Sequence, residues 1–161
     1  MSKVPSLVVD TNVWLDLFLF DRPGKPDTES FLRTAILRKA ELFYPARILC
    51  DAQYIVEQSM KAYLRCEYSS LSDDAANAAR DASWSAIEQI DEIATAIGLD
   101  QGDVWVARKY RSVSNDLEDN FVIAAAQRAG ADFIVTNDLE LIAKSPVAAM
   151  TPKDMAAYLQ L

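Results

Sequence analysis

The stretch from Asp116 to Leu141 reads DLEDNFVIAAAQRAGADFIVTNDLEL, and it decides the fold of this chain. Its first part repeats apolar residues at helical spacing and ends at Gly130, the residue type that most often terminates a helix. The next apolar run, Phe133 to Val135, predicts a short buried strand. This strand leads directly into Thr136-Asn137-Asp138, so we expect a carboxylate at its carboxyl end.

A similar unit lies near the N-terminus, where Val8 to Phe18 reads VVDTNVWLDLF. The apolar run from Leu7 to Val9 predicts a strand that ends at Asp10, and Trp14 and Phe18 then recur at helical spacing. A strand, a carboxylate and a helix in this order are typical of the first unit of an α/β protein.

The remaining segments predict a further alternation of helices and strands. We expect a helix around 31–36 capped by Asp27 or Thr28, a strand at 41–44, a helix over 46–65, a long helix that reaches Ile97 and is closed by Gly98, a last strand at 147–149 and a helix from Thr151. Residues 104–110 fit either a strand or a short helix. We therefore predict an α/β fold, a three-layer α/β/α arrangement with a central, mainly parallel sheet of about four to five strands, in a single domain over residues 1–161.

Composition and charge exclude several classes of protein. The 161 residues are 51% hydrophobic, and 16 Lys and Arg stand against 24 Asp and Glu, which gives a net charge of −8. A protein this acidic does not bind nucleic acid by bulk charge alone, although it can do so through bound cations. Histidine is absent, which excludes Ser-His-Asp, Cys-His and His-ligated zinc chemistry. Cys50 and Cys66 form no CxxC pair, and no membrane segment or signal peptide is recognisable, so we expect a cytoplasmic protein without a membrane partner.

Acidic residues stand at the positions where an α/β sheet places its functional groups. Asp10 and Asp138 follow buried strands, and Asp116 and Asp119 lie three residues apart at a helix start, where they can share one face. Converging carboxylates repel one another unless a cation neutralises them, and an all-oxygen donor set favours Mg²⁺ or Mn²⁺. Taken singly, each of these acids fits a helix cap or a turn equally well.

Three segments together resemble the PIN-domain nucleases, which are metal-dependent ribonucleases best known as VapC-type toxins of bacterial toxin–antitoxin pairs. They are the two stretches quoted above and MTPKDMAAYL, from Met150 to Leu159. The middle of the chain, 69–111, is predicted to be helical and matches no part of the family. The resemblance implies hydrolysis of RNA phosphodiester bonds by a metal-activated water, a cofactor that is Mg²⁺ or Mn²⁺, a homodimer, and a cognate antitoxin protein.

Family site residues carry over by position. The resemblance implies a metal-ligand set of Asp10, Asp119, Asp138 and the auxiliary Asp116, and polar residues that support it at Asn12 and Thr136. Asn120 and Asn137 lie beside these acids and fit a supporting role, although we expect both to be polar surface residues.

The second acid of the family is the one departure. PIN proteins usually carry a Glu on the helix after the second strand, about six residues past its start; here the sixth residue after Pro45 is Asp51, while Glu57 lies further along the helix. Asp51 fits the spacing and Glu57 fits the residue type, so both stay candidates. The implied catalytic set is Asp10, Asp51, Glu57, Asp119 and Asp138.

An acidic ribonuclease must still hold its polyanionic substrate. The candidate RNA-binding residues are Arg22, Lys25 and Arg33, with Arg38 and Lys39 nearby, and a second basic stretch contains Arg108, Lys109 and Arg111. Each of these residues is equally consistent with an ordinary solvated helix face. Trp14 and Trp84 have the spacing of core residues, whereas the spacing of Trp105 assigns it no role.

Two other functions compete with the nuclease. A phosphatase with an aspartate nucleophile also begins with a strand and an Asp, but it requires a second Asp two residues later, where this chain has Asn12, and a downstream Lys that Lys144 supplies poorly. A PIN-fold module could also bind RNA or a protein without cutting. If neither Asp51 nor Glu57 reaches the other acids, the affinity for metal falls and this non-catalytic function is favoured.

Overall fold

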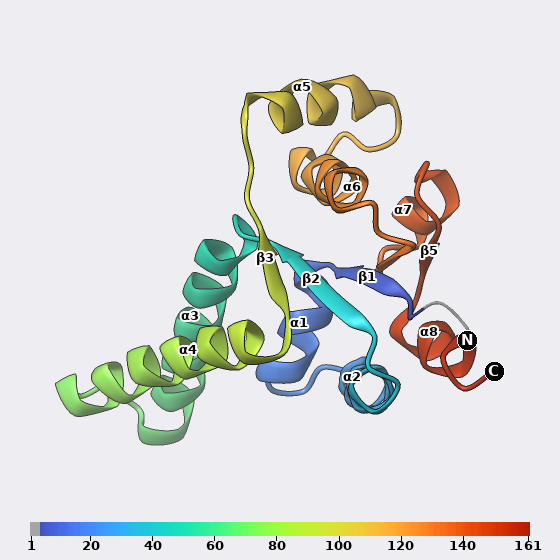
Figure 1. Ribbon diagram of the computed structural model, residues 1–161. Coiled ribbons are helices and arrows are strands. Elements are labelled where there is room, and N and C mark those ends of the chain that lie inside the picture. Colours follow the sequence, from blue (N-terminus) through green and yellow to red (C-terminus); the bar gives the residue numbers. More distant parts are fainter. Residues whose placement is uncertain (1–3) are drawn as a thin grey trace.

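The structure of the protein is a computed structural model, and its residues 4–161 are described (Figure 1). Residues 1–3, which the single predicted domain includes, lie outside the described part. Residues 4–161 contain a sheet of five strands in the order β3-β2-β1-β4-β5, and every neighbouring pair is parallel. The strands are β1 (Ser6–Val9), β2 (Glu41–Pro45), β3 (Thr95–Ile97), β4 (Phe133–Val135) and β5 (Ala149–Met150). The predicted fold class is therefore confirmed.

Helices cover both faces of the sheet and make the three layers. They are α1 (Thr11–Phe18), α2 (Lys25–Leu37), α3 (Ile48–Tyr68), α4 (Asp73–Ile93), α5 (Gln101–Lys109), the 3₁₀ turn η1 (Tyr110–Ser112), α6 (Leu117–Ala129), α7 (Leu139–Lys144) and α8 (Pro152–Tyr158). Figure 1 shows α5, α6 and α7 on one side of the sheet and α1, α2, α4 and α8 on the other.

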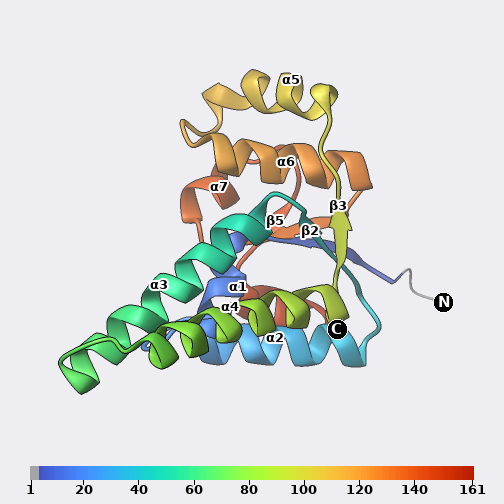
Figure 2. The same cartoon turned by 90° about the vertical axis from the view of Figure 1, so that its left-hand side faces the viewer.

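The central strand β1 explains why there are two apolar cores. Successive side chains of a strand point to opposite faces, so Leu7 and Val9 pack with α1, α2 and α8, while Val8 packs with α6 and α7. A strand buried on both faces is apolar throughout, as this one is from Leu7 onward. On the side of α1, the helices α3 and α4 form an antiparallel pair that extends away from the sheet (Figure 2).

The sequence predicted a helical segment over 69–111, but this segment also contains a strand. Helix α4 ends at Ile93, Ala94 is extended, and Thr95–Ile97 pairs with Phe43–Pro45 as strand β3. The predicted helix through Ile97 is therefore wrong, because the free edge of β2 offers backbone hydrogen bonds that override a local helical pattern. Residues 104–110, by contrast, belong mainly to helix α5, which begins with a capping box at Asp100.

Two smaller predictions are also corrected. Helix α2 begins at Lys25 after Gly24, earlier than a cap at Asp27 or Thr28 would place it, and a proline in its first turn suits that start. Trp14 is buried as predicted, but Trp84 is 57% exposed, because α4 turns Ser83, Ala86 and Ile90 inward instead. Among the helices of residues 4–161, none has both the length and the apolarity that crossing a lipid bilayer requires.

Candidate functional site

The candidate site lies where the central strands β1 and β4 end. Val9 lies opposite Val135 in this parallel pair, so the residues that follow, Asp10 and Thr136, emerge side by side. The strand order also changes direction here, because β2 lies on one side of β1 and β4 on the other. In open parallel sheets, such a switch point leaves a crevice at the carboxyl ends of the strands, where ligands bind.

Asp10 is buried and is held entirely by neutral donors. Its Oδ1 accepts a hydrogen bond from the backbone N–H of Thr11 at 2.7 Å, and its Oδ2 accepts from Thr136 Oγ1 at 2.7 Å and from Asn12 Nδ2 at 2.9 Å. The residue is only 3% exposed, and no Lys or Arg of residues 4–161 forms an ion pair with it. Asn12 and Thr136 thus contact the carboxylate that the sequence analysis expects them to support.

The surroundings of Asp10 disfavour its negative charge. Burial is the largest cause and raises the pKa of Asp10 to about 6; the hydrogen bonds from Thr136 and Thr11 oppose this shift, and the negative charges of Asp119 and Glu118 add to it. A buried carboxylate with neighbouring carboxylates and no cation is unfavourable unless it is protonated or a positive ion binds.

Asp116 and Asp119 lie at the start of α6 and face the same cluster. Asp116 is the N-cap of the helix, with its Oδ1 accepting from the backbone N–H of Glu118 at 2.8 Å. Asp119 Oδ2 accepts from Ser114 Oγ at 2.7 Å. Partial burial raises the pKa of Asp119, as do the charges of Asp116, Asp138 and Glu118, while the Ser114 hydrogen bond lowers it. These acids are therefore close enough to affect one another's protonation.

Asp138 joins the cluster from the turn after β4. Its Oδ1 caps α7 by accepting from the backbone N–H groups of Glu140 and Leu141, at 2.8 and 3.0 Å. Its own backbone N–H donates to Thr136 Oγ1 at 3.1 Å, so the hydroxyl that holds Asp10 also fixes this turn. Capping occupies one oxygen of Asp138, and its other oxygen has no donor within residues 4–161. The cap and ligand roles are thus compatible.

Glu118 belongs to this cluster, although the sequence analysis did not single it out. Its Oε1 accepts a hydrogen bond from Thr11 Oγ1 at 2.7 Å, which links α6 to the first residue of α1. Its charge also contributes to the raised pKa values of Asp10 and Asp119. The available signal was its place between two candidate acids in D-L-E-D, but only the packing of α6 beside β1 reveals its direction.

The two asparagines differ from each other. Asn120 is 2% exposed, so its predicted surface position is wrong; its Nδ2 donates to the backbone carbonyl of Ser114 at 2.8 Å and thereby anchors the residue that holds Asp119. Asn137 is exposed as predicted, and its side chain donates to Asp16 Oδ2 at 2.7 Å. Its backbone N–H donates to Asn12 Oδ1 at 3.0 Å.

The candidates for the second acid occupy different environments on α3. Asp51 lies in the first turn, is half-exposed and forms a loose ion pair with Arg47 at 3.4 Å. Glu57 lies further along and accepts hydrogen bonds from Lys61 and from Gln53, with Arg80 of α4 3.9 Å away. Lys61 is the main cause that lowers the pKa of Glu57. The described contacts of Glu57 are therefore with α3 and α4.

The predicted RNA-binding residues near the N-terminus are also unequal. Arg22 donates from Nε to buried Asp16 at 2.7 Å, and Asp16 in turn holds Asn137 beside the site. Lys25 and Arg33 lie on α2 and form no ion pair within residues 4–161. RNA binding by these three residues stays a prediction.

Carboxylate chemistry at this edge fits a hard divalent cation. Asp116, Asp119 and Asp138 each use one oxygen in a protein hydrogen bond and keep one oxygen without a donor from residues 4–161. In the described part of the chain, no three acidic, His or Cys side chains converge closely enough to surround an ion as they stand. Metal binding at this edge would therefore require these carboxylates to move closer together.

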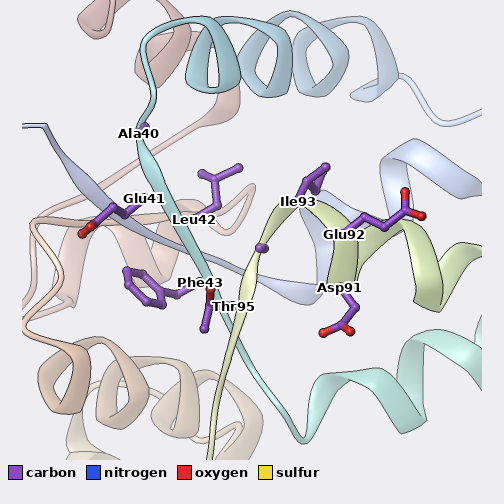
Figure 3. A pocket seen from close by; sticks show the side chains of 9 residues that line it. Ala40, Glu41, Leu42, Phe43, Asp91, Glu92, Ile93 and Thr95 are labelled. Carbon is purple, nitrogen blue, oxygen red and sulfur yellow. The ribbon is translucent and has the colours of Figure 1, made fainter.

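A second acidic region lies at the amino ends of the strands, opposite the candidate site. A hollow of about 460 Å³ is lined by 40–43 and 91–95, at the amino ends of β2 and β3. Figure 3 shows the side chains that line it. Its Asp91 accepts a hydrogen bond from the hydroxyl of Tyr44 at 2.7 Å, and Glu41 and Glu92 are exposed. Because the hollow is at the wrong end of the strands, its acids do not contribute to the Asp10 cluster.

Comparisons with known proteins agree with this fold. A family model described as the PIN domain matches residues 6–140. A crystal structure of VapBC2 from Rickettsia felis, bound to a DNA fragment from their promoter, is 13% identical, with a TM-score of 0.63 over 91% of this chain and 98% of that one. PAE2754 from Pyrobaculum aerophilum is 17% identical, with a TM-score of 0.61 over 99% and 98%. At such identities the two structures show a shared fold. No curated protein sequence matches the chain.

Proposed function

This chain belongs to the PIN-domain family, and on that premise we propose that it is an endoribonuclease that depends on Mg²⁺ or Mn²⁺. The observation that carries the proposal is Asp10, a buried carboxylate at the switch point of the sheet that has neutral donors and no cationic partner within residues 4–161. The charges of Glu118 and Asp119 reach it from the start of α6. These carboxylates can all be ionised without a large cost in stability only when a positive charge binds beside them.

In this proposal Asp10, Asp119 and Asp138 hold the ion, with Asp116 as an auxiliary acid. When bound there, a divalent ion supplies the Lewis acidity that activates water for attack on a phosphodiester. The chain itself holds the carboxylates in place. Thr136 holds Asp10 and the backbone of Asp138 through one hydroxyl.

Asp51 is our proposed second acid, in preference to Glu57. Lys61 and Arg80 already neutralise Glu57 between α3 and α4, so this carboxylate needs no metal ion to balance its charge. The Arg47 guanidinium pairs with Asp51 at 3.4 Å and lies 5.7 Å from the centre of the Phe121 ring, so one side chain connects Asp51 with α6. Phe121 follows Asp119 by two residues.

We further propose that the chain is the toxin of a toxin–antitoxin pair, acts in the cytoplasm and forms a homodimer. The shared fold with VapBC2 from Rickettsia felis supports an antitoxin partner. A phosphatase with an aspartate nucleophile is less well supported, because the position two residues after Asp10 is Asn12, whose side chain bridges Asp10, Thr136 and the backbone of Asn137.

The test is cleavage of a labelled RNA by wild type and Asp10→Asn, with Mn²⁺ or with EDTA. We expect cleavage with Mn²⁺ that EDTA abolishes and that falls at least about 10²-fold in the variant, since a lost ligand removes the ion that activates the water. Asp81→Asn, which alters an exposed acid on α4, is the matched control and should cleave like wild type. Intact RNA with phosphate released from a small monoester would indicate the phosphatase, and RNA binding without either reaction would indicate a non-catalytic module.

A further inference from the structure

The exposed face of α5 carries a basic and aromatic surface near the candidate site. It consists of Trp105, Arg108, Lys109 and Arg111, which we call the α5 patch. The first three residues follow the i, i+3, i+4 spacing of one helix face, opposite the buried Asp103 and Ala107. Trp105 is 60% exposed, and Lys109 Nζ lies 4.6 Å from the centre of its ring. One face of the indole is thus covered by a cation.

Outside this patch, six of the twelve Lys and Arg residues within residues 4–161 form ion pairs. Within residues 4–161, Arg108, Lys109 and Arg111 form no ion pair, although the chain carries a net charge of −8. By contrast, Arg128, one helix away, binds both Asp100 and Asp103. The dipole of α5 accounts for basic residues in its last turn, but not for an exposed Trp or for Arg111 beyond the helix.

The chain places this patch beside the acids of the candidate site. Helix α5 continues into η1, and two residues later Ser114 donates its hydroxyl to Asp119. Figure 2 shows that the connection from α5 to α6 lies at the same end of the molecule as α7, whose N-cap is Asp138. A strand of nucleic acid that leaves the acidic cluster across η1 therefore meets Arg111 first and then the face of α5.

From these observations we infer that the α5 patch binds a single-stranded segment of the RNA substrate. A base stacks on the open face of Trp105, and Arg108, Lys109 and Arg111 contact phosphates. Single strands are bound in this way by an aromatic platform beside cations, because every base has a stacking face and every phosphate a charge. This inference rests on the proposed function, since it names the surface that would hold the substrate of that site.

The test measures binding of a fluorescein-labelled single-stranded RNA to the full chain in Mg²⁺, by anisotropy, with Asp10→Asn in every protein to prevent cleavage. Adding Trp105→Ala should weaken binding about 5- to 100-fold, and Trp105→Phe should restore most of the loss. Adding the three alanines at the basic positions should lower the slope of log K against log salt by about 2, at about 0.7 per lost phosphate contact on a single strand. Trp84→Ala, which removes an equally exposed Trp from α4, is the matched control and should bind normally.

Cleavage by the variants with Asp10 intact separates this inference from the proposed function. For Trp105→Ala we expect a raised KM with kcat retained. If wild type fails to cleave RNA but Trp105→Ala still loses binding, the nuclease proposal fails and the RNA-binding patch stands. The patch is overturned if Trp105→Ala binds RNA as Trp84→Ala does, or if no protein of the set binds RNA. It is equally overturned if Trp105→Ala changes only the oligomeric state in light scattering.

Discussion

Two carboxylates of this protein, Glu57 and Asp10, have opposite electrostatic surroundings. Glu57 receives hydrogen bonds from Lys61 and Gln53 and lies near Arg80, and these neighbours lower its pKa. Asp10 is more deeply buried, receives only neutral donors and has other carboxylates nearby, and its pKa is raised to about 6. The same functional group is thus neutralised by basic side chains in one place, and in the other it has no counter-charge from residues 4–161.

This difference indicates where a cation is expected from outside the chain. A carboxylate paired with Lys and Arg contributes to packing of α3 against α4 and has no need of an ion. A buried carboxylate beside others costs stability, and that cost is retained in proteins where binding or catalysis uses the charge. On this basis we propose that the carboxyl ends of the strands form the functional region and that Glu57 has a structural role in the α3–α4 pair.

The largest expected effect separates the two candidates for the second acid. Asp51→Asn should lower Mn²⁺-dependent RNA cleavage by about 10²- to 10³-fold with the fold intact, because it removes a proposed ligand. Glu57→Gln should retain cleavage within about threefold and lower stability instead, because it leaves Lys61 without its partner. Steady-state cleavage and thermal unfolding of both variants check this prediction. Loss of cleavage in Glu57→Gln alone would reverse the assignment.

A second prediction concerns the dependence of stability on pH without metal. The pKa of Asp10 in the folded protein, about 6, lies above the ordinary value of 3.8, so the folded state binds more protons between these values. Its contribution to the free energy of unfolding therefore falls as pH rises from about 4 to 6, by up to about 3 kcal/mol at roughly 1.4 kcal/mol per pKa unit. Asp10→Asn in EDTA should be more stable than wild type above pH 6, and similar to it below pH 4.

Urea unfolding of wild type and Asp10→Asn across this pH range measures the difference. The comparison isolates Asp10, because acids with lowered pKa values, such as Glu57 and Asp100, are present in both proteins and act in the opposite direction. Millimolar Mn²⁺ should then stabilise wild type at pH 7 and leave the variant nearly unchanged. If wild type is more stable than Asp10→Asn at pH 7 in EDTA, the burial of the Asp10 carboxylate does not lower the free energy of unfolding.

Local patterns sufficed for the parts of the fold and site that depend on neighbouring residues. An apolar run that ends in an acid predicted strand β1 with Asp10 after it, and strand β4 with Asp138 three residues beyond it. Gly130 was expected to end a helix, and it adopts the left-handed conformation there, with φ of 61°. In each case a few consecutive residues carry the cause, so the sequence displays it directly.

Contacts between distant segments were not predictable in the same way. The spacing of Ile90, Ala94 and Ile97 is helical, yet Ile97 joins a strand because β2 has a free edge. The direction of Glu118 and the burial of Asn120 depend on how α6 lies against β1 and the Ser114 loop. Spacing favoured Asp51 and residue type favoured Glu57, and the contact that distinguishes them, Arg80 of α4 at 3.9 Å from Glu57, joins distant segments.

The smallest expected effect tests whether the neutral donors around Asp10 position it for an ion. Thr136 Oγ1 donates to Asp10 and accepts from the backbone of Asp138 and from Asn12 Nδ2, so Thr136→Val removes all three contacts at nearly constant volume. Groups that orient metal ligands typically contribute 10- to 100-fold in affinity, and we expect about a 10-fold weaker affinity for Mn²⁺. Calorimetric titration of the full chain with Mn²⁺ measures it without reference to cleavage.

Thr28 supplies the matched control for that experiment. It is also a fully buried threonine, but its hydroxyl has no hydrogen-bond partner among residues 4–161 and it lies on α2, in another part of the chain. Thr28→Val should therefore keep wild-type Mn²⁺ affinity and equal or exceed wild-type stability, since it removes an unsatisfied buried polar group. Equal losses of Mn²⁺ affinity in both variants would mean that general destabilisation weakens metal binding. A loss confined to Thr136→Val would mean that one hydroxyl holds two carboxylate-bearing strand ends in register for the ion.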